Sequence, residues 1–93
     1  MLFHFQVRTV THVMLTEAAE LVGTEEARVE AARRIGELLK QHANELWTDG
    51  EWQMDVTDGR GLILFVIQIS AVRTAATSGG ASALALAPGS AGL

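Results

Sequence analysis

The side chains in this chain that offer metal-ligand or acid-base chemistry are three histidines and a run of carboxylates. No two of His4, His12 and His42 have the four-residue spacing that turns both imidazole rings of a helix toward one metal ion. No carboxylate stands with them in a zinc-ligand pattern. His42 falls on an apolar helical stripe and is interpreted as a packed or rim residue. The histidines therefore predict no metal site.

The carboxylates gather between residues 49 and 58, yet their pattern indicates a turn rather than a site. The segment Asp55-Val-Thr-Asp-Gly lacks the ligand register of a calcium-binding loop, and the pair Asp58-Gly59 is typical of turns. Neither Ser70 nor Ser78 has the context of a nucleophile elbow, and no glycine-rich segment joins a strand to a helix as a phosphate-binding loop does. We therefore expect no catalytic, cofactor-binding or metal-binding residues, and a protein that is not an enzyme.

Composition indicates one small domain followed by a tail. The last charged residue of the 93-residue chain is Arg73, and the following residues are mostly Ala, Gly and Ser. We expect a single α+β domain over residues 1–73 and a flexible tail over residues 74–93. A chain this short buries only about 60% of the surface that its unfolded form exposes. Since it has no cysteine to form disulfides or thiolate metal sites, oligomerisation is the remaining source of stability.

Charge and hydropathy limit the classes of partner. Seven basic and eleven acidic side chains give a net charge of −4, which repels phosphate backbones on average. The longest apolar run, residues 62–67, is far shorter than the roughly 20 residues that a membrane-spanning helix needs. The first residues show neither the basic leader nor the continuous apolar core of an export signal. We expect a cytoplasmic protein with no cofactor and with no membrane or nucleic-acid partner.

The first elements are expected to form a hairpin. Residues 2–8 alternate between apolar and polar side chains, which is typical of a half-buried strand. Residues 10–17 are rich in Val, Thr and Leu and are expected to return antiparallel, with Val13 opposite Val7. The connection has no Gly, Asn or Asp to accept a positive φ, so a helix over residues 16–21 is the alternative.

One long helix is expected to follow from residue 24, and Thr48, Asp49 and Gly50 are expected to end it. Thr24 is its candidate N-cap, and two glutamates follow in the first turn, where the helix dipole favours negative charge. Apolar residues recur at three- and four-residue intervals and define one stripe: Ala27, Ala31, Ala32, Ile35, Leu38, Leu39, His42 and Leu46. Gly36 is interpreted as a point of close packing on the sheet. The outer face carries mixed charge and is interpreted as solvated: Arg28, Glu30, Arg33, Arg34, Glu37 and Lys40.

The most informative stretch is a second hairpin over residues 51–69. The expected pairing sets Trp52 across from Ile67, with an Asp-Gly turn between the strands and an apolar face under the helix. On the other face, the last strand carries three aliphatic side chains without an apolar partner: Leu62, Leu64 and Val66. Either the chain itself covers them or they form an exposed interface. We favour the interface, and with it a homodimer, because the domain is small.

These elements predict an α+β fold of the ββαββ type, an antiparallel four-stranded sheet with one long helix packed on one face. Strand order is not determined by the pattern. The aromatic side chains assigned to the face under the helix are Phe3, Phe5, Trp52 and Phe65. The basic residues of the helix are interleaved with glutamates. Neither a basic helix face nor an aromatic open sheet therefore predicts nucleic-acid binding, whereas a protein partner remains open.

Several motifs are shared with a known family. They are Phe3-His-Phe, the Ala- and Glu-rich run at residues 25–34, Trp52 to Asp58 followed by Gly61, and a late Ser-Ala-Val at residues 70–72. Over about residues 2–72 the chain resembles a family of short bacterial proteins classed as a domain of unknown function. The resemblance implies a hairpin, a helix and a second hairpin, and no activity, because the family has none assigned. The chain departs from the family at the first turn, which lacks Asp-Gly, and in its tail.

A second resemblance lies in the opening of the helix, Thr24-Glu-Glu-Ala. It is similar to small antitoxin-like domains of toxin-antitoxin systems, in which a hairpin precedes a helix that begins in this way. The resemblance implies, as an alternative, a regulatory module that binds a protein or nucleic-acid partner. It is an analogy of fold, which by itself is a poor guide to function.

Overall fold

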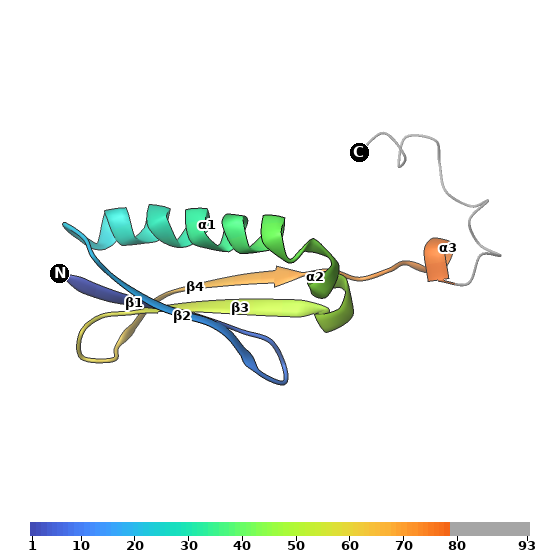
Figure 1. Cartoon of the computed structure of the whole chain (residues 1–93), viewed down its shortest axis with the longest axis horizontal. Helices are drawn as coiled ribbons and strands as arrows, with labels where there is room; N and C mark the ends of the chain where they lie inside the picture. The colour runs from blue at the N-terminus through green and yellow to red at the C-terminus, as the bar shows by residue number, and fades with distance from the viewer. Residues whose placement is uncertain (79–93) are drawn as a thin grey trace.

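The computed structural model describes residues 1–78, and Figure 1 shows a sheet with one long helix above it. The elements follow the order β1 (Leu2–Arg8), β2 (Val13–Glu20), α1 (Thr24–Gln41), α2 (Ala43–Asp49), β3 (Glu51–Thr57), β4 (Ile63–Ser70) and α3 (Ala75–Ser78). The short helix α3 stands away from the sheet (Figure 1) and occupies the start of the segment for which a flexible tail was expected. The rest of that tail, residues 79–93, lies outside the described residues.

The four strands form one antiparallel sheet in the order β2-β1-β3-β4. Helix α1 covers one face of this sheet, which confirms the predicted ββαββ class (Figure 1). The core lies between helix and sheet and consists of Phe3, Phe5, Val7, Ala27, Ala31, Ile35, Leu38, Leu46, Trp52, Met54 and Val56. Because alternate residues of a strand point to opposite faces, the odd positions of β1 and the even positions of β3 supply its sheet side.

The first hairpin forms, but its expected register was wrong by two residues. Leu15, not Val13, pairs with Val7, and the strand runs to Glu20, so the alternative helix over residues 16–21 was also wrong. The turn contains no residue with positive φ. Instead the Thr9 hydroxyl oxygen accepts hydrogen bonds from the backbone N–H of Thr11 and of His12, each at 3.1 Å. A threonine side chain thus closes the loop that was expected to need glycine or asparagine.

The expected long helix is two helices, because the backbone breaks at His42. His42 has φ −125° and ψ 41°, outside the helical region, and it ends α1 and precedes α2. Its ring nitrogen Nδ1 lies 2.9 Å from a carboxylate oxygen of Glu45. Gly23, not Thr24, is the N-cap, and no side chain caps α1. Helix α2 ends at Gly50, whose φ of 82° is the left-handed conformation that favours glycine.

Gly36 does not provide close packing on the sheet, contrary to the expectation. It is exposed, and a Cβ placed there would find no atom within 4 Å. We therefore expect Gly36→Ala to stabilise the protein by about 1 kcal/mol, because alanine restricts the unfolded chain and favours helix at no steric cost. The midpoint of urea unfolding measures this. Gly61→Ala is the matched control, since φ is 88° there and the same methyl group should lower the midpoint. A lower midpoint for Gly36→Ala would contradict the assignment.

The second hairpin was also predicted two residues out of register. Trp52 pairs with Ile69 rather than Ile67. Two features of the structure account for the shift: a five-residue loop, residues 58–62, and a bulge in which Leu64 is the additional residue of β4. The sequence had placed Leu64 in one outward row with Leu62 and Val66. The bulge removes it from that row, because one additional residue in a strand reverses which face each following side chain points to.

Candidate interaction surface

The two outer strands of the sheet, β2 and β4, differ in charge. Strand β2 carries Glu17 and Glu20, and both carboxylates are in ion pairs, with Arg34 at 2.7 Å and with the terminal amine at 2.8 Å respectively. Strand β4 contains no charged residue over its whole length, Ile63–Ser70. Proteins usually protect an edge strand with charge, proline or a covering element, because its free N–H and C=O groups can pair with another chain. Within residues 1–78, β4 is therefore the less protected edge of this sheet.

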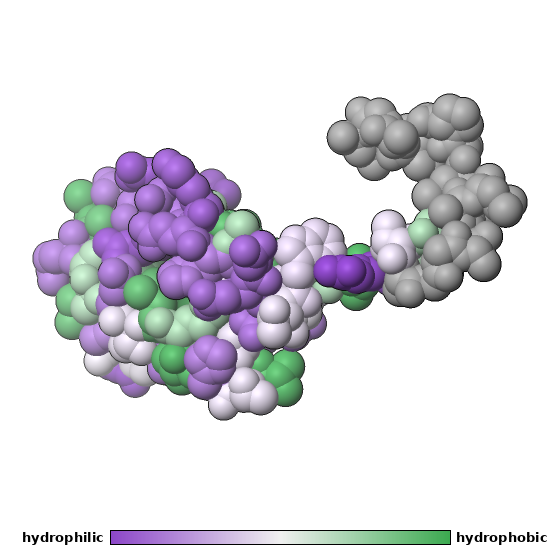
Figure 2. Space-filling model, turned by 45° about the vertical axis from the view of Figure 1, so that its right-hand side comes forward, coloured by the Kyte–Doolittle hydropathy of each residue, from purple (hydrophilic) through white to green (hydrophobic). Residues whose placement is uncertain are grey.

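Exposed aliphatic side chains lie just before β4, at its start and in its middle. Leu62 is 61% exposed, Ile63 53% and Val66 49%. Of the three residues predicted for the interface, Leu62 and Val66 thus lie on the surface, whereas Leu64 is partly buried and packs against the core. The sequence pattern did not predict that Ile63 is exposed; the bulge at Leu64 places the Ile63 side chain on the surface. Figure 2 shows hydrophilic side chains gathered over the helical layer and hydrophobic ones scattered below it.

Asp58 shapes the loop that positions β4, as the Asp-Gly turn predicted. Its carboxylate accepts hydrogen bonds from the backbone N–H groups of Leu62 at 3.0 Å and Arg60 at 2.9 Å. Gly61 completes the turn with a φ of 88°. The two N–H donors, that of Leu62 first, hold the pKa of the Asp58 carboxyl below its ordinary value, because they favour the charged form. The same bonds fix Leu62 beside the exposed start of β4.

A pH dependence follows from the lowered pKa of Asp58. Because the folded pKa lies below the unfolded one, the stabilisation is complete above the unfolded pKa and is lost as pH falls through the folded pKa. In Asp58→Asn, an amide oxygen still accepts both bonds but does not titrate. The difference in unfolding free energy between wild type and Asp58→Asn should be constant above about pH 5 and shift against the wild type below about pH 4. Urea titrations at each pH measure it; a constant difference down to pH 2 would contradict the role of Asp58.

A polar network crosses the face of the sheet opposite α1. Asp55 is buried there, accepts a hydrogen bond from the Gln53 amide at 2.9 Å and lies 3.5 Å from the Arg8 guanidinium. The Gln68 amide of β4 donates in turn to the Gln53 side-chain oxygen at 3.1 Å. Among the described residues no buried side-chain nitrogen or oxygen lacks a partner. The network is therefore internally satisfied, and it fastens β4 to β3 and β1.

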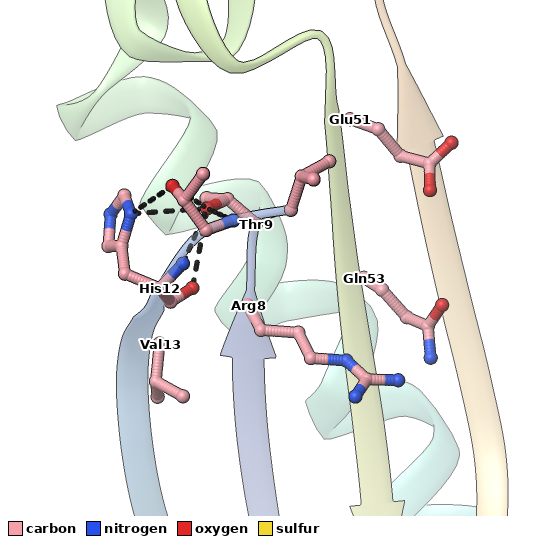
Figure 3. Close-up of a pocket in the computed structure, with 8 residues that line it drawn as sticks. Arg8, Thr9, His12, Val13, Glu51 and Gln53 are labelled. Atoms are coloured by element: carbon pink, nitrogen blue, oxygen red, sulfur yellow. Dashed lines mark hydrogen bonds between the residues drawn. The ribbon is translucent and has the colours of Figure 1, made fainter.

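A shallow groove of about 410 Å³ opens beside this network, between the β1–β2 loop and the start of β3. Figure 3 shows the His12 ring directed at the hydroxyls of its own loop, while the Arg8 side chain extends across β3. The Nδ1 atom of His12 lies 3.1 Å from the Thr9 hydroxyl oxygen and 3.0 Å from that of Thr11. These groups hold the turn together. Over residues 1–78 no three His, Asp or Glu side chains are grouped as metal ligands.

Arg34 has a role that the sequence pattern missed, since it was assigned to the solvated face. Its guanidinium bonds Glu30 at 2.8 Å and Glu17 at 2.7 Å and lies 4.7 Å from the centre of the Phe5 ring. It therefore links α1 to β2, the edge strand opposite β4. A four-residue spacing from Glu30 was visible in the sequence, but the contact with Glu17 depends on the tertiary fold.

Comparison with protein families gives one informative result. The model of a family described as "Domain of unknown function (DUF6894)" matches residues 2–70. The chain belongs to this family. The matched segment begins with β1 and ends with β4, so it spans the sheet with helices α1 and α2. No curated protein and no solved structure matches the chain. In residues 1–78 of this DUF6894 protein, no helix has the length and hydropathy to span a membrane.

Proposed function

We propose that this DUF6894 domain acts by protein association rather than by catalysis, and that its partner is a second copy of the chain bound through β4. The observation that carries the proposal is the contrast between the two sheet edges. β4 has no charged residue and exposes Ile63 and Val66, with Leu62 exposed just before it, whereas β2 carries two glutamates. An uncharged, aliphatic edge is suited to pairing with another strand, and a charged edge is not.

Size and charge support the same proposal. A domain of this length has a small core and gains stability from a partner subunit. Each copy carries a net charge of −4, so two copies repel each other over most of their surfaces. β4 is a surface on which this repulsion is smallest, because its own residues carry no charge. The lack of cysteine suits a reducing compartment, and we place the protein in the bacterial cytoplasm as part of the proposal.

The alternative of an antitoxin-like module that binds nucleic acid receives less support. Sheet domains of this kind stack bases on exposed aromatic side chains. Phe3 and Phe5 are fully buried beneath α1, and Trp52 is buried beside them. The three arginines of α1 are paired with glutamates, as in the contacts of Arg28 with Glu25 and of Arg33 with Glu30. The charge that would attract a phosphate backbone is thus largely neutralised on that face.

Sedimentation equilibrium of the full 93-residue chain over a wide range of concentration tests the proposal. We expect the mass of a dimer at the upper concentrations and reversible dissociation on dilution. Raising the salt concentration should strengthen the association slightly, because it screens the repulsion between two acidic copies. The mass of a monomer at every concentration would contradict the proposal.

A further inference from the structure

We infer that β4 of one copy pairs antiparallel with β4 of the second about a two-fold axis at Ile67, so that the dimer forms one eight-stranded sheet. This inference rests on the proposed function and specifies its geometry. It selects edge-to-edge pairing over stacking of two sheets through their open faces. The open face carries the network of Arg8, Asp55 and Gln53, a polar surface that stacking would have to desolvate. The backbone of β4, in contrast, still has hydrogen-bonding groups to offer at the sheet edge.

The alternation of side chains restricts where the two-fold axis can lie. In an antiparallel pair, two residues directly opposite each other point to the same face of the sheet. A two-fold axis perpendicular to the sheet keeps each side chain on the same face in both copies. An odd-numbered residue in the regular part of β4 can therefore stand opposite only an odd-numbered residue of the partner, and an even-numbered residue only opposite an even-numbered one. The axis therefore lies midway between one residue and its own copy, and not between two different residues of β4. Within the regular part of β4, beyond the bulge at Leu64, Ile67 is the central residue of the apolar row Phe65, Ile67 and Ile69.

Pairing about Ile67 makes that row complementary to itself. Ile67 stands opposite its own copy, and Phe65 stands opposite the partner's Ile69, a favourable aromatic and β-branched pair. These three side chains are partly buried in one copy and pack against its core on the α1 side. On the other face, Val66 stands opposite the partner's Gln68. Because the axis preserves faces, both α1 helices cover the same face of the joined sheet, above one continuous apolar row.

The flanks of β4 support the antiparallel direction. Leu62 and Ile63 are exposed at one end of the strand, and Val72 is 77% exposed just beyond the other. Antiparallel pairing brings each end of β4 beside the opposite end of the second copy. Leu62 and Ile63 then come next to the partner's Val72, which leaves less apolar surface in water. In a parallel arrangement the start of β4 would instead lie beside the start of the partner's β4. A two-fold axis perpendicular to the sheet does not generate that arrangement.

Disulfide formation between engineered cysteines tests the register, because the chain has no cysteine of its own. Val66→Cys and Gln68→Cys are made separately in the full chain and then mixed in equal amounts under mild oxidation. In the inferred register, residue 66 faces residue 68 of the partner at about 5 Å between Cα atoms, within disulfide reach. Two copies of the same variant place their thiols diagonally, at about 7–8 Å or more. We expect the mixture to form covalent dimer about tenfold faster than either variant alone.

The control is a pair of exposed positions with the same two-residue spacing on the opposite edge. Thr16→Cys and Ala18→Cys lie two residues apart on β2, are exposed, and should not cross-link when mixed. A dimer by sedimentation in which the β4 mixture reacts no faster than its single variants would overturn the register while leaving the proposed function in place. Cross-linking confined to the β2 mixture, or a monomer by sedimentation, would overturn both.

Discussion

Trp52→Ala is expected to lower the free energy of unfolding by about 3–5 kcal/mol. Trp52 has no exposed surface, and its indole Nε1–H donates to the Asp49 carboxylate at 2.9 Å. The substitution leaves a cavity at the centre of the core and an acceptor without its donor. A domain of this size has a total stability on the order of 4–11 kcal/mol, so the variant should be largely unfolded at modest urea concentrations. Urea titration followed by far-ultraviolet circular dichroism measures the change.

Trp47→Ala is the control, because the chain supplies a second tryptophan in a different environment. Trp47 is 55% exposed on α2. Its replacement should change the unfolding free energy by no more than about 0.5 kcal/mol. Equal losses for the two variants would contradict the placement of the core between α1 and the sheet.

Val66→Lys is expected to weaken self-association by about tenfold or more, that is by at least about 1.4 kcal/mol. In the proposed dimer the substitution brings two ammonium groups close to the two-fold axis and removes an aliphatic contact. In the monomer the side chain is half exposed and next to Asp55 across the strand pair, so the fold tolerates the charge. Sedimentation equilibrium gives the dissociation constant, and circular dichroism checks the fold.

Thr16→Lys introduces the same charge at the other edge of the same row. Thr16 pairs with Gln6, Gln6 with Asp55, and Asp55 with Val66, so the two positions differ chiefly in the edge they occupy. The dissociation constant of Thr16→Lys should equal that of the wild type. Equal weakening in both variants would contradict the proposal, because it would show that the effect does not depend on the β4 edge.

The alternation of apolar side chains was sufficient to predict much of the fold. Residues 2–8 and 51–57 were recognised as strands, and Phe3, Phe5 and Trp52 were assigned to the buried face where the structure has them. Alternation predicts such strands because the burial of one face shows in adjacent positions of the sequence. The Gly50 end of α2 and the Asp58 turn were recognisable for the same reason, since each depends on the backbone preferences of one or two residues.

The registers of both hairpins depended on interactions that a local pattern does not contain. The residue types of Met14 and Leu64 do not mark them as bulges. Each bulge nevertheless shifts the pairing of its strand and moves the side chains beyond it to the other face of the sheet. The loop before β2 is closed by the Thr9 hydroxyl, a role that any threonine could have. Strand order and the contact of Arg34 with Glu17 join elements distant in sequence. For this reason the exposed surface differs from the predicted set of residues: Ile63, rather than Leu64, lies on the surface with Leu62 and Val66.

Amide hydrogen exchange of β4, resolved by residue in the full chain at low and at high protein concentration, tests the central claim most directly. Pairing through β4 predicts that amides of residues 65–69 that face outward exchange quickly when the protein is dilute and slowly when it is concentrated. The outward amides of β2 serve as the internal reference and should exchange at the same rate in both samples. Exchange in β4 that is fast and independent of concentration, like that of β2, would contradict the account.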